Sequence, residues 1–176
     1  MRGASALMAD ADGATEIADL DKLEAALDAV AVDAGGAHGR VGVAVGSRAH
    51  MQETSVAQRS LLRTILMFGF HFFVSLLCSA KIRDTQCGFK LFTRHAAATL
   101  FSSLHLERWA FDVELVHLCE RLDIPVAEVA VRWQEIEGSK LIQSKLDVVT
   151  TSLTMLRDMV CVRLCYELGL WKPRLP

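Results

Sequence analysis

The stretch ALMADADGAT, residues 6–15, decides the expected fold because two acidic side chains directly follow a short apolar run. Ala6–Ala9 is typical of a buried strand in an α/β protein. Such strands deliver polar residues at their carboxyl ends, where open α/β sheets bind ligands. Asp10 and Asp12 are therefore expected at a ligand-binding edge of the sheet.

The segments that follow predict a β-α-β unit. A helix is expected with Asp19 as its N-cap and a continuous apolar face as far as Val30, ended by the glycines at 35–36. Residues 41–48, VGVAVGSR, predict a second buried strand that again ends in polar residues. The two strand ends are expected to meet.

The rest of the chain predicts further helices and strands of one domain or part of one. The expected elements are an unusually apolar helix over 56–78, a strand over 88–93, helices over 94–104 and 111–122, a half-exposed strand over 125–133 and a last, largely apolar helix over 146–168. A helix as apolar as the last one packs in a core or lies in a membrane interface.

Composition excludes several classes of protein. Of the 176 residues, 52% are hydrophobic, which argues against disorder, and the formal net charge of −2 gives no basic field for binding nucleic acid. The five cysteines are odd in number and widely spaced, so reduced thiols are expected rather than a disulfide framework or a zinc site. The most apolar segment, 65–80, falls short of the roughly 20 residues needed to span a bilayer.

Asp10 and Asp12 are the candidate metal ligands. Two carboxylates separated by one small residue can hold a divalent cation whose other positions take diphosphate oxygens. An acidic turn without metal is the alternative. An EF-hand is excluded, because Ala14 and Thr15 occupy the places of a further ligand and of the required glycine.

A second group of residues suits phosphate. Arg48 follows the second strand, and Arg59, Ser60 and Arg63 lie near the start of the apolar helix. Guanidinium groups present planar forks of donors that match phosphate oxygens. A solvated helix start is the alternative, but a phosphate on a long hydrocarbon would fit cations beside an apolar surface.

Two more segments carry candidates. In KIRDTQCGFKLF, residues 81–92, Asp84 precedes a strand and Gly88 allows the backbone to approach a ligand closely. In RWQEIEGSK, residues 132–140, Lys140 ends a loop that follows a strand, where a surface hairpin is the alternative to a ligand-binding loop.

Taken together, the motifs resemble those of family 2 glycosyltransferases that act on dolichyl phosphate, from Ala6 to about Leu170. The motifs are ADADGAT, GSRAHMQETSVAQRSLLR, RDTQCGFKLFTR, ERWAFDVEL and EIEGSKL. The resemblance implies an α/β fold of the GT-A type, a sandwich around a mostly parallel sheet. It also implies inverting transfer of glucose from UDP-glucose to dolichyl phosphate for protein N-glycosylation. Related mannose synthases share the broad pattern, so mannose or another hexose is the alternative sugar.

The same resemblance implies roles for the candidate residues. The implied roles are metal and donor diphosphate binding by Asp10 and Asp12, phosphate binding by Arg48, Arg59, Ser60, Arg63 and Lys140, and a catalytic position near the acceptor for Asp84. The implied cofactor is Mg²⁺ or Mn²⁺. No role beyond a structural one is expected for Asp112 or Glu114.

Members of this family begin with a membrane anchor and a uridine-binding half, whereas this chain opens just before its D-x-D motif. We therefore expect residues 1–145 to be the C-terminal portion of a catalytic domain that is incomplete at its N-terminus. Residues 146–176 are expected to form an apolar helix and tail at a membrane interface. The implied location is the endoplasmic reticulum membrane, with the site facing the cytosol. An inactive lipid-phosphate-binding fragment and a purely structural domain are the alternatives.

Overall fold

The computed structural model describes residues 3–35, 39–51, 69, 82–134 and 145–174. Its elements are, in chain order, β1 (Ser5–Ala9), η1 (Ile17–Asp19), α1 (Leu20–Val30), β2 (Val32–Asp33), β3 (Arg40–Val41), β4 (Val43–Ser47), β5 (Phe89–Thr93), α4 (Arg94–Ser103), η4 (Arg108–Ala110), α5 (Phe111–Arg121), β6 (Val126–Ala130) and α6 (Lys145–Glu167).

The main sheet has four strands in the order β1-β5-β4-β6. β4 and β6 are parallel, whereas β5 is antiparallel to both of its neighbours, β1 and β4. The expected mostly parallel sheet is therefore a mixed one. The reason is that the chain leaves β4 at Ser47 and returns beside the same end, where Asp84 bonds Arg48, so β5 has to run back in the opposite direction.

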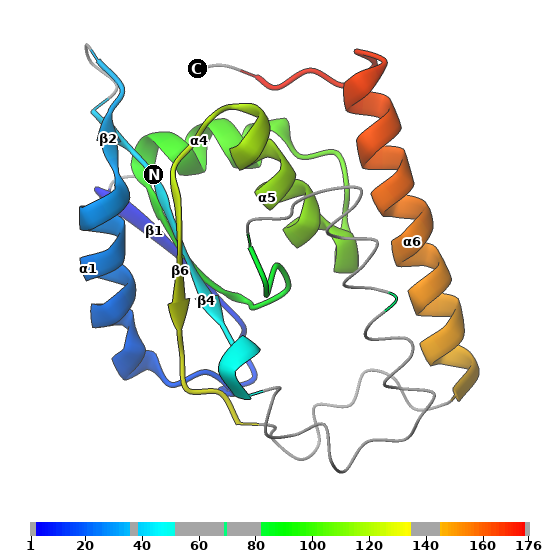
Figure 1. Cartoon of the computed structure of the whole chain (residues 1–176), viewed down its shortest axis with the longest axis horizontal. Helices are drawn as coiled ribbons and strands as arrows, with labels where there is room; N and C mark the ends of the chain where they lie inside the picture. The colour runs from blue at the N-terminus through cyan, green and yellow to red at the C-terminus, as the bar shows by residue number, and fades with distance from the viewer. Residues whose placement is uncertain (1–2, 36–38, 52–68, 70–81, 135–144, 175–176) are drawn as a thin grey trace.

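Helices cover both faces of the sheet. Figure 1 shows α1 on one side, α4 and α5 on the other, and α6 beyond α5 at the outside of the molecule. The strands alternate accordingly, since successive side chains of a strand point to opposite faces. Val43, Val45 and Phe92 face α4 and α5, while Ala44 and Leu91 face α1.

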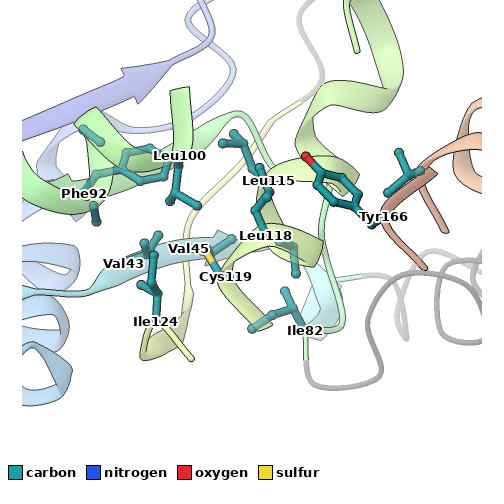
Figure 2. Packing of buried hydrophobic residues seen from close by; sticks show 14 residues of the cluster. Val43, Val45, Ile82, Phe92, Leu100, Leu115, Leu118, Cys119, Ile124 and Tyr166 are labelled. Atoms are coloured by element: carbon teal, nitrogen blue, oxygen red, sulfur yellow. The ribbon is translucent and has the colours of Figure 1, made fainter. Parts of the chain in front are cut away.

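Two apolar clusters follow from this alternation. The larger lies between the sheet, α4, α5 and α6, and Figure 2 shows Leu100, Leu115, Leu118 and Tyr166 gathered in it. The smaller packs α1, through Leu23 and Leu27, against the opposite face. The two clusters share the strands β4 and β5, so the sheet joins them.

Most of the expected elements are confirmed within one or two residues. One detail at α1 is wrong. The helix ends at Val30, where Ala31 turns to an extended conformation, rather than at the glycines of 35–36. Asp19 occupies the expected N-cap position, but its side chain makes no capping bond and instead binds Arg132. Apart from residue 69, the predicted helix over 56–78 lies outside the described residues.

The last helix is partly buried. Met155, Met159, Val162 and Tyr166 of α6 are buried, which accounts for one side of its apolar circumference. Across the described ranges, no helix combines the length and apolar character needed to cross a membrane.

Candidate active site

The carboxyl ends of β1, β4 and β6 meet at one edge of the sheet, because these three strands run in the same direction. Asp10 follows β1 and Arg48 follows β4. The segments after β1 and β6 pair with each other through a bridge between Thr15 and Trp133, and the Gln134 amide donates to the Ala14 carbonyl over 2.8 Å. This edge holds the candidate site.

Arg48 and Asp84 form a two-pronged ion pair at this edge. The Arg48 guanidinium donates from Nε to Oδ2 over 2.8 Å and from Nη2 to Oδ1 over 2.9 Å, and the Arg48 amide also donates to Oδ2. Such bidentate pairs fix both partners in one plane. The ring of Trp133 lies 5.4 Å from the Arg48 Cζ, so the cation has an aromatic face beside it.

The pair stays charged inside the protein. Burial opposes the ionised form of Asp84, but the hydrogen bonds and charge of Arg48, with a smaller contribution from Lys90, hold the pKa of Asp84 below its ordinary value. Burial likewise opposes the charge of Arg48, and the bonds from Asp84 together with the charge of Asp10 keep its pKa above the ordinary value.

Glu128 of β6 supports the segment that carries Asp84. Its two carboxylate oxygens accept the amides of Arg83 and Asp84, each over 3.1 Å. The loop entering β5 is thereby tied to β6, which lies on the far side of β4 in the sheet. Asp84 is held from both sides, by Glu128 through its backbone and by Arg48 through its side chain.

Asp10 lies directly against Gly88. The Asp10 amide donates to the Gly88 carbonyl over 3.0 Å, and its carboxylate occupies the space that a Cβ on Gly88 would need. Among the described residues, no donor hydrogen bonds to the Asp10 carboxylate. Gly88 and Asp84 belong to the same segment before β5, so Asp10 lies on the segment that also holds Arg48. The negative charge of Asp10 contributes to raising the pKa of Arg48 and of Asp112.

Asp12 is placed differently. Its side chain is exposed, and its Oδ1 accepts the Ala14 amide over 2.9 Å, which is the geometry of an Asx turn. The local structure of Asp12 is thus the acidic turn considered as the alternative. No described residue hydrogen bonds to the other carboxylate oxygen of Asp12, so that oxygen can bind a ligand.

A buried lysine lies beneath these groups. Lys90 of β5 donates from Nζ to the Asp112 Oδ1 over 2.6 Å and to the Cys87 carbonyl over 2.7 Å. Burial raises the pKa of Asp112, and the adjacent Lys90 partly offsets this effect. The cations Arg48 and Lys90 are thus interleaved with Asp10, Asp84 and Asp112.

The sequence interpretation missed Lys90 as part of this site. Lys90 lies two residues before Phe92 in the alternating strand, so it faces the core, where a lysine requires a partner. That signal is present in the sequence, but the partner Asp112 is not adjacent in it. Four predicted phosphate-binding residues lie outside the described residues: Arg59, Ser60, Arg63 and Lys140.

The fit of a divalent cation can be judged from the residues in place. The described ranges contain no group of three or more His, Cys, Asp and Glu side chains that would enclose a metal ion by itself. Asp10 and Asp12 can supply two carboxylates, and Mg²⁺-type sites at phosphates typically take one or two carboxylates plus substrate oxygens. The residues therefore fit a cation shared with a diphosphate, not a closed protein cage.

Comparison with curated proteins shows which proteins the chain is similar to. It is 53% identical over 171 residues to "Dolichyl-phosphate beta-glucosyltransferase" of Homo sapiens, covering 97% of this chain and 50% of that protein. The proteins of that name from Dictyostelium discoideum and Saccharomyces cerevisiae are 49% and 40% identical over 97% and 98% of this chain, and the matches cover 49% and 51% of those proteins. The chain is a homologue of dolichyl-phosphate beta-glucosyltransferases.

The resemblance expected from the motifs is confirmed by these names. The chain spans about half the length of the curated relatives it matches. No protein-family model matches it. The match extends over nearly the whole chain, so the segments that carry Asp10, Arg48 and Asp84 all lie within homologous sequence or at its margins.

Proposed function

We propose that the chain forms part of the catalytic domain of an enzyme that transfers glucose from UDP-glucose to dolichyl phosphate. The observation that carries the proposal is the Arg48–Asp84 pair beside Asp10, at the edge where β1 and β4 end, in a chain homologous to transferases of that name. A mixed sheet with helices on both faces supports a fold of the GT-A type.

The proposed chemistry is inverting displacement at the anomeric carbon by a phosphate oxygen of the lipid. A phosphate monoester has a second pKa near 6, so the nucleophile is mostly ionised at neutral pH. The chain's task is to hold two anions in line. Arg48 suits this role, because a guanidinium fixed by Asp84 and Trp133 keeps its orientation when a phosphate approaches.

In this proposal Asp84 orients Arg48, because both of its carboxylate oxygens accept hydrogen bonds from Arg48 and its pKa lies below the ordinary value. Such a carboxylate is a weak proton acceptor. This refines the expected catalytic position of Asp84 near the acceptor. Arg59, Ser60, Arg63 and Lys140 are proposed to complete the phosphate contacts.

Asp10 and Asp12 are proposed to hold Mg²⁺ or Mn²⁺ together with the donor diphosphate. The bound cation would offset the charge that develops on the departing UDP. The Asp10 carboxylate is exposed beside Gly88, which supports this assignment. Without a side chain on Gly88, the carboxylate can lie close against the backbone of β5.

A membrane interface is proposed as the setting of the reaction, on the cytosolic side of the endoplasmic reticulum. The lipid acceptor requires access to a bilayer, and α6, the outermost helix in Figure 1, carries apolar side chains toward solvent. The exposed apolar residues of α6 are Val149, Leu153, Val160 and Leu164. Their exposure supports contact of residues 146–176 with the headgroup region.

The test is transfer of radiolabelled sugar to dolichyl phosphate by this chain and by a human relative into which the same substitutions are introduced. UDP-glucose with Mn²⁺ should support transfer by the longer protein, and GDP-mannose should not compete. Substitution of the residues matching Asp10 and Arg48 by alanine should each lower kcat/KM by about 100-fold or more. Competition by GDP-mannose would reassign the sugar. Full activity of both variants would reject the proposed site.

The chain itself provides a second arm of the test. Binding of dolichyl phosphate in mixed micelles without any transfer would indicate that this half of the relatives' length carries only acceptor binding. Activity that is lost on adding EDTA and restored by Mn²⁺ would support the cation. Activity that EDTA leaves unchanged would reject the proposed metal role of Asp10 and Asp12.

A further inference from the structure

Lys90 is a charged side chain in a place that water does not reach. It lies on the face of β5 that packs against α5, and only 1% of its side-chain surface is exposed. Its Nζ donates to Asp112 Oδ1 over 2.6 Å and to the Cys87 carbonyl over 2.7 Å. Buried charges persist only where such partners satisfy them.

The two bonds of Lys90 join three parts of the molecule. Asp112 lies in the first turn of α5, and the Cys87 carbonyl belongs to the segment that enters β5. The next residue, Gly88, accepts the Asp10 amide over 3.0 Å and lies against the Asp10 carboxylate. Three residues before Cys87, Asp84 holds Arg48. Lys90 therefore anchors the loop that both halves of the site share.

General stability does not explain a lysine at this position. The same face of β5 carries Phe92, and the neighbouring cluster is apolar, so a methionine or leucine at position 90 would pack there. Replacement of buried ion pairs by apolar residues of similar volume is often neutral or stabilising. What an apolar residue cannot do is bind the Cys87 carbonyl and place a positive charge among Asp10, Asp84 and Asp112.

We propose that Lys90 and Asp112 are positioning residues of the site, which fix residues 84–88 so that the Asp10 carboxylate and the Arg48–Asp84 pair keep their relative placement. That this placement serves catalysis rests on the proposed transferase function. That Lys90 and Asp112 fix residues 84–88 does not rest on it, because the positioning can be measured in the chain without substrate.

The first measurement is amide hydrogen exchange by NMR. The amides of Asp10 and Arg48 report on the loop, since they donate to the Gly88 carbonyl and to Asp84 Oδ2. The amide of Val43, which donates to the Pro125 carbonyl at the other end of β4, is the reference. Lys90→Met leaves Asp112 without its partner and should lower overall stability, but protection at Asp10 and Arg48 should fall on the order of tenfold more than at Val43.

Leu100→Ala is the matched control, because Leu100 is fully buried in the larger cluster and takes no part in the hydrogen bonds of Lys90. It should lower overall stability without a selective effect on Asp10 and Arg48.

A second pair of variants tests Asp112. Asp112→Asn keeps an acceptor oxygen for Lys90 and should retain most of the protection, whereas Asp112→Ala should behave like Lys90→Met.

The second measurement is Mn²⁺ binding in the presence of UDP, which supplies the diphosphate, followed by electron paramagnetic resonance. Lys90→Met and Asp112→Ala should weaken Mn²⁺ binding on the order of tenfold, with Asp112→Asn and Leu100→Ala close to the unsubstituted chain. If the unsubstituted chain fails to bind Mn²⁺ in the presence of UDP, the proposed metal site is wrong, and the exchange data still decide the positioning role.

Three outcomes would overturn the inference. One is unchanged protection at Asp10 and Arg48 in Lys90→Met, and another is a loss equal to that at Val43. The third is an unsubstituted chain in which neither loop amide is protected. If Lys90→Met does not fold, equal protection of the Asp10 and Arg48 amides in Asp112→Ala and Asp112→Asn would also overturn the inference.

Discussion

At Gly88, the addition of a single methyl group is expected to disturb the candidate site. A Cβ at this position would overlap the Asp10 carboxylate. The backbone of Asp10 is held in place by the hydrogen bond from its amide to the Gly88 carbonyl. Gly88→Ala should therefore displace the Asp10 carboxylate while the fold persists. We expect Mn²⁺ affinity to fall by about tenfold, or about 1.4 kcal/mol, as measured by paramagnetic resonance titration.

A double variant shows whether Gly88 acts through Asp10. In an Asp10→Ala background the methyl group meets no carboxylate, so adding Gly88→Ala should weaken Mn²⁺ binding no further. An additional tenfold loss in that background would contradict the explanation and point to a direct effect on the loop.

Asp84 gives the site a defined response to acid. Burial raises the pKa of Asp84, but the bonds and charge of Arg48 lower it more, so the folded-state pKa lies below the ordinary 3.8. The stability that this carboxylate contributes is therefore fully present above about pH 4 and is lost as the pH falls through the folded-state pKa. Asp84→Asn should cost about 3 kcal/mol near pH 7, because Arg48 loses its partner.

Urea unfolding of the two proteins at several pH values checks this prediction. The difference in unfolding free energy between Asp84→Asn and the unsubstituted chain should be constant from pH 7 to about pH 5 and should shrink below about pH 4. A difference that stays the same down to pH 3 would mean that the ion pair is not what stabilises this loop.

At the scale of elements, Glu114 of α5 fixes the outer helix α6. Its buried carboxylate accepts the His105 amide over 3.1 Å and the Leu106 amide over 2.7 Å, and the Tyr166 hydroxyl of α6 donates to it over 2.9 Å. The ring of Trp171, after α6, stacks on His105 with the centroids 4.3 Å apart. Glu114 thus has a structural role, and Tyr166 is the residue of α6 that hydrogen bonds to it.

Two variants separate the bonds of Glu114. Tyr166→Phe removes one hydroxyl and leaves Glu114 with both backbone donors, so a loss of about 1 kcal/mol is expected. Glu114→Ala leaves the His105 and Leu106 amides without their acceptor and leaves the Tyr166 hydroxyl only its longer bond to the Ser103 carbonyl, so a loss of about 3 kcal/mol is expected. Chemical denaturation measures both losses. Equal losses would show that the tyrosine bond alone holds α6.

At the scale of the whole molecule, the two apolar clusters are joined through one sheet. Leu23 belongs to the cluster under α1 and Leu100 to the cluster under α4, and neither side chain is exposed. Leu23→Ala and Leu100→Ala should each lower the unfolding free energy by about 2–5 kcal/mol. Because β4 and β5 contribute side chains to both clusters, each variant should unfold in a single transition.

Circular dichroism and tryptophan fluorescence during urea unfolding provide the check. Coincident transitions by the two probes are expected for both variants. Two separate transitions in Leu23→Ala, with α4 and α5 retained in the first, would show that the two faces of the sheet fold independently.

Much of the site could be predicted from local patterns. Apolar runs with period two give the strands, and acidic or basic residues directly after them mark the edge at which Asp10 and Arg48 are found. Lys90 and Asp112 could not be paired in this way, because their contact depends on how β5 packs under α5. Asp19 is the N-cap as expected, but the partner of its side chain could not be predicted for the same reason, since Arg132 lies 113 residues away.

By itself, the sequence determined the longer strands and helices that the structure describes, the polar residues that follow β1 and β4, and the homology to dolichyl-phosphate beta-glucosyltransferases, whereas β2, η1 and η4 were not predicted. These features depend on residue order and on spacing within short segments. Only the tertiary structure decided the antiparallel insertion of β5 between β1 and β4, the bonding of Arg48 to Asp84 and the burial of Lys90. The physical reason is that each of these requires segments distant in the chain to meet, and their partners become known only when the sheet is assembled.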